Sequence, residues 1–317
     1  MDPNLDYANI YKESSRKLQK KIFRHVNVDE PRNDFAYVAK SLAGEEAYEY
    51  AAVFTLGKAK CESMSGKSLA EAAALMEAGR LFARAEENLQ TTSAFSSGEF
   101  LENALSCFLK AAKIYDSCMS LTHAANCYIF AGDTLWKFRK LSEAVKVYSL
   151  AADIFCRDAP RVTHILMKCL QIYVISRDYS SALNTVFKIQ TLVLDACATH
   201  GYEIELFLEQ LKVTEVYRVL LVLFTLPPKS KAISKDGPMS LSPYIDENGE
   251  ITQGSIAEYL DEDLFINLKS LILAHTSEDL NSLDITASFL QACLDSTQRG
   301  ILQDLVEQAT NPPDDVL

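Results

Sequence analysis

The chain of 317 residues carries 31 lysines and arginines against 43 aspartates and glutamates, a net charge of −12 that argues against a general nucleic-acid binder. Its 48% hydrophobic and 23% charged residues exclude wholesale disorder. The longest apolar stretch, residues 219–226, is about a third of a membrane span. Eight cysteines without a CxxC pair, behind an N-terminus without an apolar signal core, predict reduced thiols in the cytosol.

Helical periodicity dominates the sequence, and no stretch alternates long enough to predict a strand. Three Ser-x-x-Glu boxes, which begin at Ser68, Ser96 and Ser255, predict helix starts at which the hydroxyl accepts a hydrogen bond from a free backbone amide. The predicted helices are residues 5–24, 31–43, 45–64, 68–89, 97–116, 119–136, 140–156, 160–176, 179–200, 203–226, 258–275, 278–294 and 297–309.

A segment rich in proline, glycine and serine, residues 227–257, interrupts this pattern as a predicted loop. It separates a helical repeat body, residues 1–226, from acidic C-terminal helices, residues 258–317, that we expect to continue the solenoid. The charge balance changes here too: residues 236–317 hold sixteen carboxylates and two cations, whereas the first 235 residues hold 27 and 29. A neutral body with one acidic end favours an oriented partner surface.

A pattern of small residues around one aromatic ring recurs along the chain. It reads Ala104-x-x-x-Phe108-x-x-Ala111, and returns 40 residues later around Tyr148. This spacing places all three side chains on one helix face, where the alanines let a neighbouring helix approach and the ring fills the space between. A repeat of 33–40 residues predicts an all-α, tetratricopeptide-like α-solenoid of stacked antiparallel helix pairs. The alternative is a plain helical bundle with alanine-rich packing.

Two helices carry surfaces with more than one interpretation. Residues 203–226 are apolar on more than one face, which indicates either burial from two sides or a stripe that faces a partner. Residues 12–24 carry six cations and one carboxylate. This basic face is either a solvated surface or a site for anionic lipid or an acidic partner.

No motif predicts an enzyme, a cofactor or a metal centre. Residues 66–68 read GKS, but Cys61 stands where a phosphate loop needs glycine, and no strand precedes it. His123 and Cys127 lie one helical turn apart and would need two more ligands to hold zinc. The cysteines instead occupy repeat core positions, where a thiol behaves as a small hydrophobic group.

Several segments, in order along the chain, resemble the forty-kilodalton huntingtin-associated protein family (the factor VIII intron 22 protein family), in its invertebrate form. They are RKLQKKIFR at 16–24, MEAGRLFARAEEN at 76–88, RDYSSAL at 177–183, YRVLL at 217–221 before LPP, EDLF at 262–265 before LKSLILA, and ILQDLVEQATNPP at 301–313. The chain lacks the family's proline-rich insertion, whose place would be near residues 199–203, and its Ala/Gly-rich leader. Roles tied to those segments are not carried over.

The resemblance implies a non-enzymatic solenoid that binds huntingtin, a HEAT-repeat scaffold, as a 1:1 heterodimer, wedged between its domains and stabilising one arrangement of them. It further implies a link to an early-endosomal Rab GTPase and to vesicle motility, with the cytoplasm, nucleus and early endosomes as locations. The candidate partner-binding residues come from the acidic end and the basic first helix: Asp261, Glu262, Asp263, Phe265, Arg16, Lys17, Lys20 and Lys21.

A second, shorter resemblance covers residues 105–155. The segments CFLKAAKIY, AANCYIFAGD and VYSLAADIF look like the helical repeats of soluble NSF attachment proteins. It implies an alternative function, an adaptor in SNARE-mediated membrane trafficking, unless it reflects only the shared physics of helical repeats.

Overall fold

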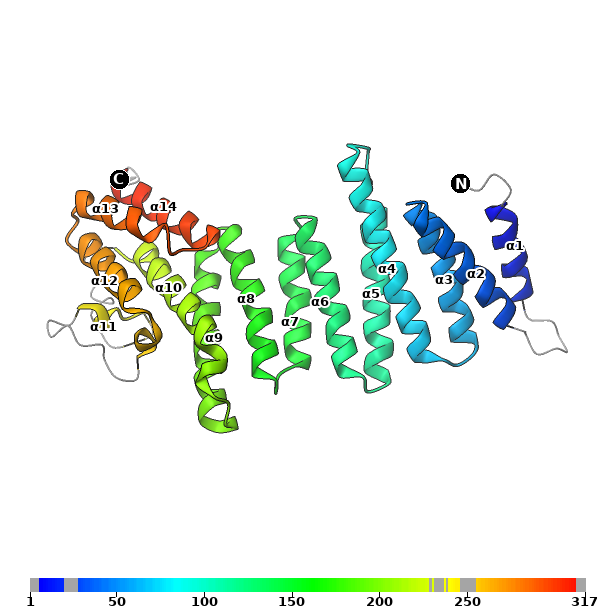
Figure 1. Ribbon diagram of the computed structural model, residues 1–317, viewed down its shortest axis with the longest axis horizontal. Helices are drawn as coiled ribbons and strands as arrows, with labels where there is room; N and C mark the ends of the chain where they lie inside the picture. Colours follow the sequence, from blue (N-terminus) through cyan, green and yellow to red (C-terminus); the bar gives the residue numbers. More distant parts are fainter. Residues whose placement is uncertain are drawn as a thin grey trace, which may run out of the picture. The chain divides into compact units, whose positions relative to one another are not determined.

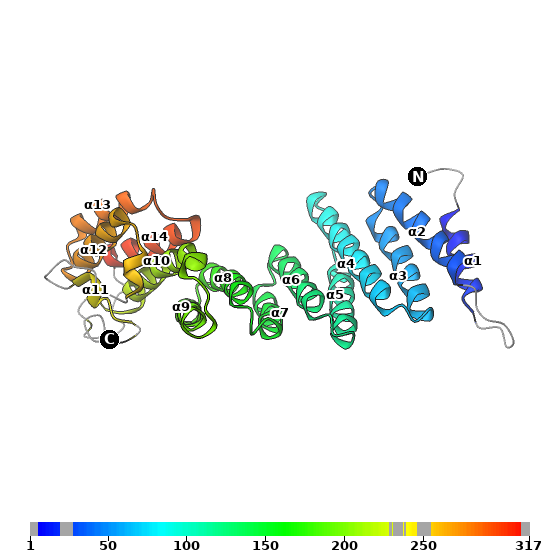
Figure 2. The same ribbon diagram turned by 60° about the horizontal axis from the view of Figure 1, so that its bottom comes forward.

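The protein is described by a computed structural model, which covers residues 6–19, 28–227, 230, 237, 239–245 and 255–311. Every regular element in these residues is a helix, and the prediction of an all-α, tetratricopeptide-like solenoid is confirmed (Figures 1 and 2). The chain divides into two compact units, Met1–Phe155 and Cys156–Leu317. No described helix is both long and apolar enough to cross a lipid bilayer.

Unit 1 is a stack in which each helix from α2 to α6 packs against the next one along the chain, which ends the stack at α7 (Figure 1). Consecutive helices run antiparallel, as the predicted repeat requires. The helices are α1 (Tyr7–Lys17), α2 (Asp29–Gly44), α3 (Tyr48–Met64), α4 (Ser68–Thr91), α5 (Glu99–Ser117), α6 (Leu121–Lys137) and α7 (Leu141–Ile154).

An aromatic ring packed against a glycine joins three pairs of neighbouring helices in unit 1. A Cβ atom built on Gly79 of α4 would lie 2.6 Å from the ring of Phe108 in α5, and one on Gly132 of α6 would lie 2.6 Å from the ring of Tyr148 in α7. Gly57 of α3 meets Phe35 of α2 in the same way, at 2.9 Å. Each ring is at most 1% exposed. The small residues of the repeat therefore accommodate rings, as the spacing predicted.

One type of helix end recurs throughout the chain. At seven helix ends among the described residues, a backbone amide donates to the carbonyl five residues earlier, as from Ser120 to Tyr115 and from Lys140 to Leu135. This is the Schellman motif, in which the residue just before the donating amide takes a left-handed backbone conformation. That residue is Met119 (φ 56°) and Arg139 (φ 62°) in these two turns, where glycine is the usual choice. The ending lets the next helix begin within a few residues, which keeps successive helices antiparallel.

Unit 2 departs from sequential stacking, because α14 returns to pack against both α8 and α10. The hydroxyl of Tyr179, at the start of α9, donates to Asp304 of α14 at 2.7 Å, and Arg177 pairs with the same carboxylate at 3.2 Å. The elements are α8 (Ala159–Ile175), α9 (Tyr179–His200), η1 (Ile204–Phe207), α10 (Leu208–Thr225), α11 (Ser242–Ile245), η2 (Ile256–Tyr259), α12 (Glu262–Thr276), α13 (Leu280–Leu290) and α14 (Ser296–Thr310).

The predicted grouping into residues 1–226, 227–257 and 258–317 stays a prediction. Most of the predicted loop lies outside the described residues, but its described part includes the short helix α11. The helices on either side of it are in contact, since α12 and α14 both pack against α10. The acidic helices therefore share a core with α10 rather than forming an isolated tail.

The three Ser-x-x-Glu boxes mark helix starts correctly, since α4, α5 and η2 begin at or within three residues of their serines, but no serine caps a first-turn amide with its side chain. The serines at the starts of α4 and η2 make no capping hydrogen bond with their side chains. Ser96 lies before α5 and donates to Glu86, while its oxygen accepts from the amide of Gly98. A capping box does occur at α14, where Asp295 and Gln298 exchange hydrogen bonds with each other's backbone amides.

We expect Gly132→Ala to lower the free energy of unfolding by about 1–3 kcal/mol, because its Cβ would overlap a fully buried ring. The hydroxyl of Tyr148 donates to Asp133, which limits retreat of that ring. The control is Gly300→Ala in α14, where a Cβ atom meets nothing within 4 Å. Since alanine favours helix, the control should stabilise by up to about 1 kcal/mol. Urea unfolding followed by circular dichroism measures both; equal effects would contradict the packing argument.

Candidate partner-binding surfaces

In the described part of the chain, the cysteines and histidines belong to no group of three or more ligand side chains that could hold a metal ion. Burial raises the pKa of the Cys61, Cys107, Cys127 and Cys169 thiols to about 11, which keeps them protonated near neutral pH. The ring of His123 stacks on Tyr115 at 5.1 Å between centroids. These thiols therefore serve as small core groups, as their repeat positions predicted.

The GKS sequence lies in the turn between α3 and α4. Gly66 takes a left-handed backbone (φ 69°) in one of the Schellman motifs, and Ser68 begins α4. This turn joins two helices, whereas a phosphate loop joins a strand to a helix. The three residues are explained by the end of one helix and the start of the next.

Helix α10 is buried from several sides, which decides between the two interpretations of residues 203–226. Its residues 219–223 are each at most 1% exposed, and the helix packs against α9, α12 and α14. The apolar faces of α10 are therefore the core of unit 2. They leave no broad stripe for a partner.

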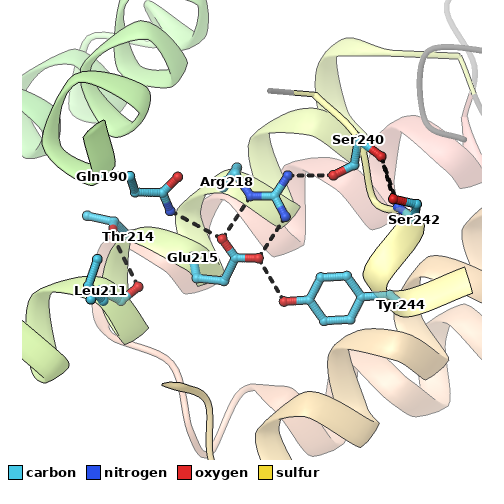
Figure 3. A network of polar contacts seen from close by, with 8 residues as sticks. All are labelled: Gln190, Leu211, Thr214, Glu215, Arg218, Ser240, Ser242 and Tyr244. Atoms are coloured by element: carbon cyan, nitrogen blue, oxygen red, sulfur yellow. Dashed lines mark hydrogen bonds and ion pairs between the residues drawn. The ribbon is translucent and has the colours of Figure 1, made fainter. Parts of the chain in front are cut away.

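A buried ion pair on α10 holds the chain that follows this helix (Figure 3). The guanidinium of Arg218 pairs with Glu215 at 2.7 Å and donates to the backbone carbonyl of Ser240 at 2.6 Å. Glu215, which is 0% exposed, also accepts from Gln190 at 3.2 Å and from the hydroxyl of Tyr244 at 2.9 Å. Burial and the Glu215 carboxylate raise the pKa of Tyr244, so this hydroxyl stays a donor. The network fixes α11 against α9 and α10.

The acidic cluster lies at the start of α12. Asp261 precedes the helix and pairs with Lys212 of α10 at 2.8 Å. Glu262 and Asp263 occupy the first turn, where the helix dipole favours negative charge, and both are exposed. Asp261 is thus engaged within unit 2, whereas Glu262 and Asp263 present their charge to solvent.

Phe265 is a core residue rather than a surface one. It is 6% exposed, and its ring stacks on Tyr244 at 5.0 Å between centroids. Tyr244 belongs to the buried network around Glu215. Phe265 therefore packs the start of α12 against the core of unit 2. Because it is buried, it is not included in the partner surface proposed below.

The basic first helix is described only to residue 19, so Lys20 and Lys21 lie outside the described residues. Lys17 pairs with Glu30 of α2 at 2.8 Å and with Asp34 at 3.5 Å. Its hydrogen bond to Glu30 raises the pKa of Lys17. Arg16 is exposed. Part of the predicted basic face therefore fastens α1 to α2.

Exposed apolar side chains occur on α12 and on α13, and the sequence pattern did not single them out. Ile285 and Phe289 stand one helical turn apart on α13 and are 58% and 64% exposed. On α12, Ile266 and Leu273 are 51% and 44% exposed. Neighbouring exposed apolar side chains, such as Ile285 and Phe289, typically mark contact surfaces. The sequence could have indicated these residues, because they are apolar at positions outside the core stripe of each helix.

A pocket of about 690 Å³ lies between α10, α12, α13 and α14. Leucines of α10, α13 and α14 line it, together with His275 of α12. The Nδ1 atom of His275 is buried, and no described residue hydrogen-bonds to it. Burial lowers the pKa of this imidazole, against a smaller opposing effect of Glu278. The folded protein therefore holds His275 neutral.

Two comparisons with known proteins agree with the two resemblances. The chain is 24% identical to the 40-kDa huntingtin-associated proteins of Mus musculus and Rattus norvegicus, in alignments that cover 97% of this chain and 93% of each relative. The alignments span 363 positions, so the relatives contain segments that this chain lacks. The predicted resemblance to this family is confirmed along nearly the whole chain.

The model of the soluble NSF attachment protein family matches residues 76–197, which include the shorter resemblance at 105–155. This match covers helices of both units, from α4 to α9. Together the comparisons support a helical adaptor.

Replacing Arg218 by methionine should cost about 3–5 kcal/mol, because it leaves the Glu215 carboxylate buried without its cation. The double variant Glu215→Gln/Arg218→Met should recover much of that loss, since a neutral amide can still accept from Tyr244. Chemical denaturation of wild type, both single variants and the double variant measures this coupling. Additive effects would show that the pair is energetically unimportant.

The neutral state of His275 makes stability depend on pH. Its pKa is lowered in the folded state, so the unfolded chain binds more protons below its ordinary value of 6.5. Stability should fall as the pH drops from 6.5 towards the folded pKa, by at most about 1.4 kcal/mol per pH unit from this residue. Urea midpoints at pH 7.5 and 5.5 should differ less in His275→Gln than in wild type. An unchanged pH dependence would remove His275 as the cause.

Proposed function

We propose that this chain is a non-enzymatic partner of huntingtin, which wedges between the HEAT-repeat domains of that scaffold and stabilises one arrangement of them. The observation that carries the proposal is the similarity to two 40-kDa huntingtin-associated proteins over 97% of the chain. The same resemblance implies a stoichiometry of 1:1. The exposed apolar side chains of α12 and α13 supply contact area, and Glu262 and Asp263, which pair with no described residue, supply orientation.

The same resemblance supports a role at early endosomes through a Rab GTPase, with the protein present in the cytoplasm, in the nucleus and on endosomal membranes. This role rests on the family resemblance, since no feature of the described residues distinguishes a Rab site. Fluorescence imaging of the tagged chain, with and without huntingtin depletion, tests it. An endosomal signal that survives depletion would assign recruitment to another partner.

A soluble NSF attachment protein-like adaptor in SNARE-mediated trafficking is the second candidate. The match of that family at residues 76–197 favours it. Stimulation of SNARE disassembly by the purified chain, in the presence of the disassembly ATPase, would support this candidate. Its absence, together with recovery of a 1:1 huntingtin complex, would leave the first.

Reversing the two free carboxylates of α12, as Glu262→Lys/Asp263→Lys, should weaken huntingtin binding and reduce its salt dependence, because both side chains face solvent. The matched control is Glu143→Lys/Asp153→Lys on α7, which reverses two exposed carboxylates, one of them also in a first helical turn. Binding to purified huntingtin is measured at about 50 and 300 mM salt. Equal behaviour of the two variants would exclude the acidic start of α12 from the interface.

A further inference from the structure

Unit 1 contains a groove that neither resemblance assigns. It has a volume of about 480 Å³ and is lined by helices α3, α4 and α5. Its apolar lining includes Leu56 and Ala59 from α3, Leu75 from α4 and Ile114 from α5. Leu75 and Ala59 are 8% and 4% exposed, so the floor is continuous with the core of unit 1.

Three lysines line the same groove. Lys60 stands on α3, and Lys110 and Lys113 stand one turn apart on α5, all of them exposed. In the described part of the chain, no carboxylate forms an ion pair with any of the three, in contrast to Lys58, which pairs with Glu77 at 2.9 Å. Glu71 is the one carboxylate among the described lining residues. The groove therefore combines an apolar floor with a surplus of positive charge.

The groups that line the groove are spaced so that one side of a partner helix could cover them. On α3, the lining positions Leu56, Ala59, Lys60 and Ser63 follow helical spacing over about two turns, roughly 10 Å. Helix α4 lies between α3 and α5, so the cations come from both sides of the floor (Figure 2). An amphipathic helix could place its apolar stripe on the floor and its flanking carboxylates against the lysines.

We propose that this groove, defined by Leu56, Leu75, Ile114, Lys60, Lys110 and Lys113, binds an acidic amphipathic helix of a partner protein. Charge complementarity selects the acidic segment, and the apolar floor selects a helix with a stripe of leucine-like side chains. A nucleic acid offers phosphates but no aliphatic stripe, and none of the described residues that line the groove is an aromatic on which a base could stack. The proposal does not depend on huntingtin.

The test uses the full chain and a fluorescent synthetic helix of about four turns, with leucines on one face and glutamates on both flanks. Two further peptides have the same leucines flanked by lysines, or the same composition scrambled so that the leucines share no face. Anisotropy should show binding of the acidic amphipathic peptide alone. Binding of the scrambled or the lysine-flanked peptide with equal affinity would overturn the proposal.

The variant Lys60→Glu/Lys110→Glu/Lys113→Glu should weaken peptide binding about tenfold or more. The matched control, Lys40→Glu/Lys140→Glu/Lys146→Glu, reverses three exposed lysines of unit 1 outside the groove and should bind as wild type does. Ile114→Gln tests the floor and should also weaken binding. Equal losses in both triple variants would overturn the groove as the site.

Vesicles of phosphatidylserine and phosphatidylcholine, and a single-stranded oligonucleotide, serve as competing ligands. The proposal of a protein partner would be wrong if the triple lysine variant lost binding to vesicles or to the oligonucleotide but bound the peptide as wild type does. The proposal is supported if peptide binding depends on the groove lysines and neither competitor displaces the peptide. Far-UV circular dichroism of every variant verifies that the helical fold is retained.

Discussion

The packing of a ring into the space beside a glycine is the constraint on which the unit 1 stack depends. Helix axes approach closely only where side chains are small, and the resulting space must be filled to native density. Gly79 and Gly132 provide the space, and Phe108 and Tyr148 fill it. Because the ring and the glycine stand on neighbouring helices, each contact also sets the register of a helix pair. A repeat that preserves this contact can vary elsewhere without losing the stack.

Unit 2 also depends on buried polar interactions. Its central helix α10 is enclosed by apolar contacts, but the segment after it is positioned by a buried ion pair, with Arg218 reaching the carbonyl of Ser240. Long-range polar contacts such as Tyr179 to Asp304 bring the last helix back to α8 and α9. Such pairs add little net stability compared with apolar packing, but a broken pair is costly, so they favour one arrangement over its alternatives. The acidic helices thus have defined positions on unit 2.

The sequence predicted helices well where periodicity is long, as at residues 179–200, because a 3.6-residue pattern over several turns has few competing explanations. It failed at the serine boxes, because a box shows only that a cap is available, and Ser96 instead bonds Glu86, ten residues away. Glu215 and Arg218 look like an ordinary surface pair on one helix face. Only tertiary contact with α11 and α9 makes them buried, and no local pattern encodes that contact.

The candidate surfaces show a similar division between what a pattern reveals and what packing decides. Charge along the chain located the acidic end, yet Asp261 and Lys17 prove to be engaged within the protein. A charge that is already paired contributes little to a new interface, because the existing pair must be broken or shared. In the proposed complex, orientation of the partner would therefore depend on Glu262 and Asp263, and affinity would depend on apolar area such as that of Phe289. Electrostatic contacts mainly set approach and register, and buried apolar area mainly sets the lifetime of a complex. An adaptor of the kind proposed would need both kinds of surface, and the acidic helices of unit 2 expose both carboxylates and apolar side chains.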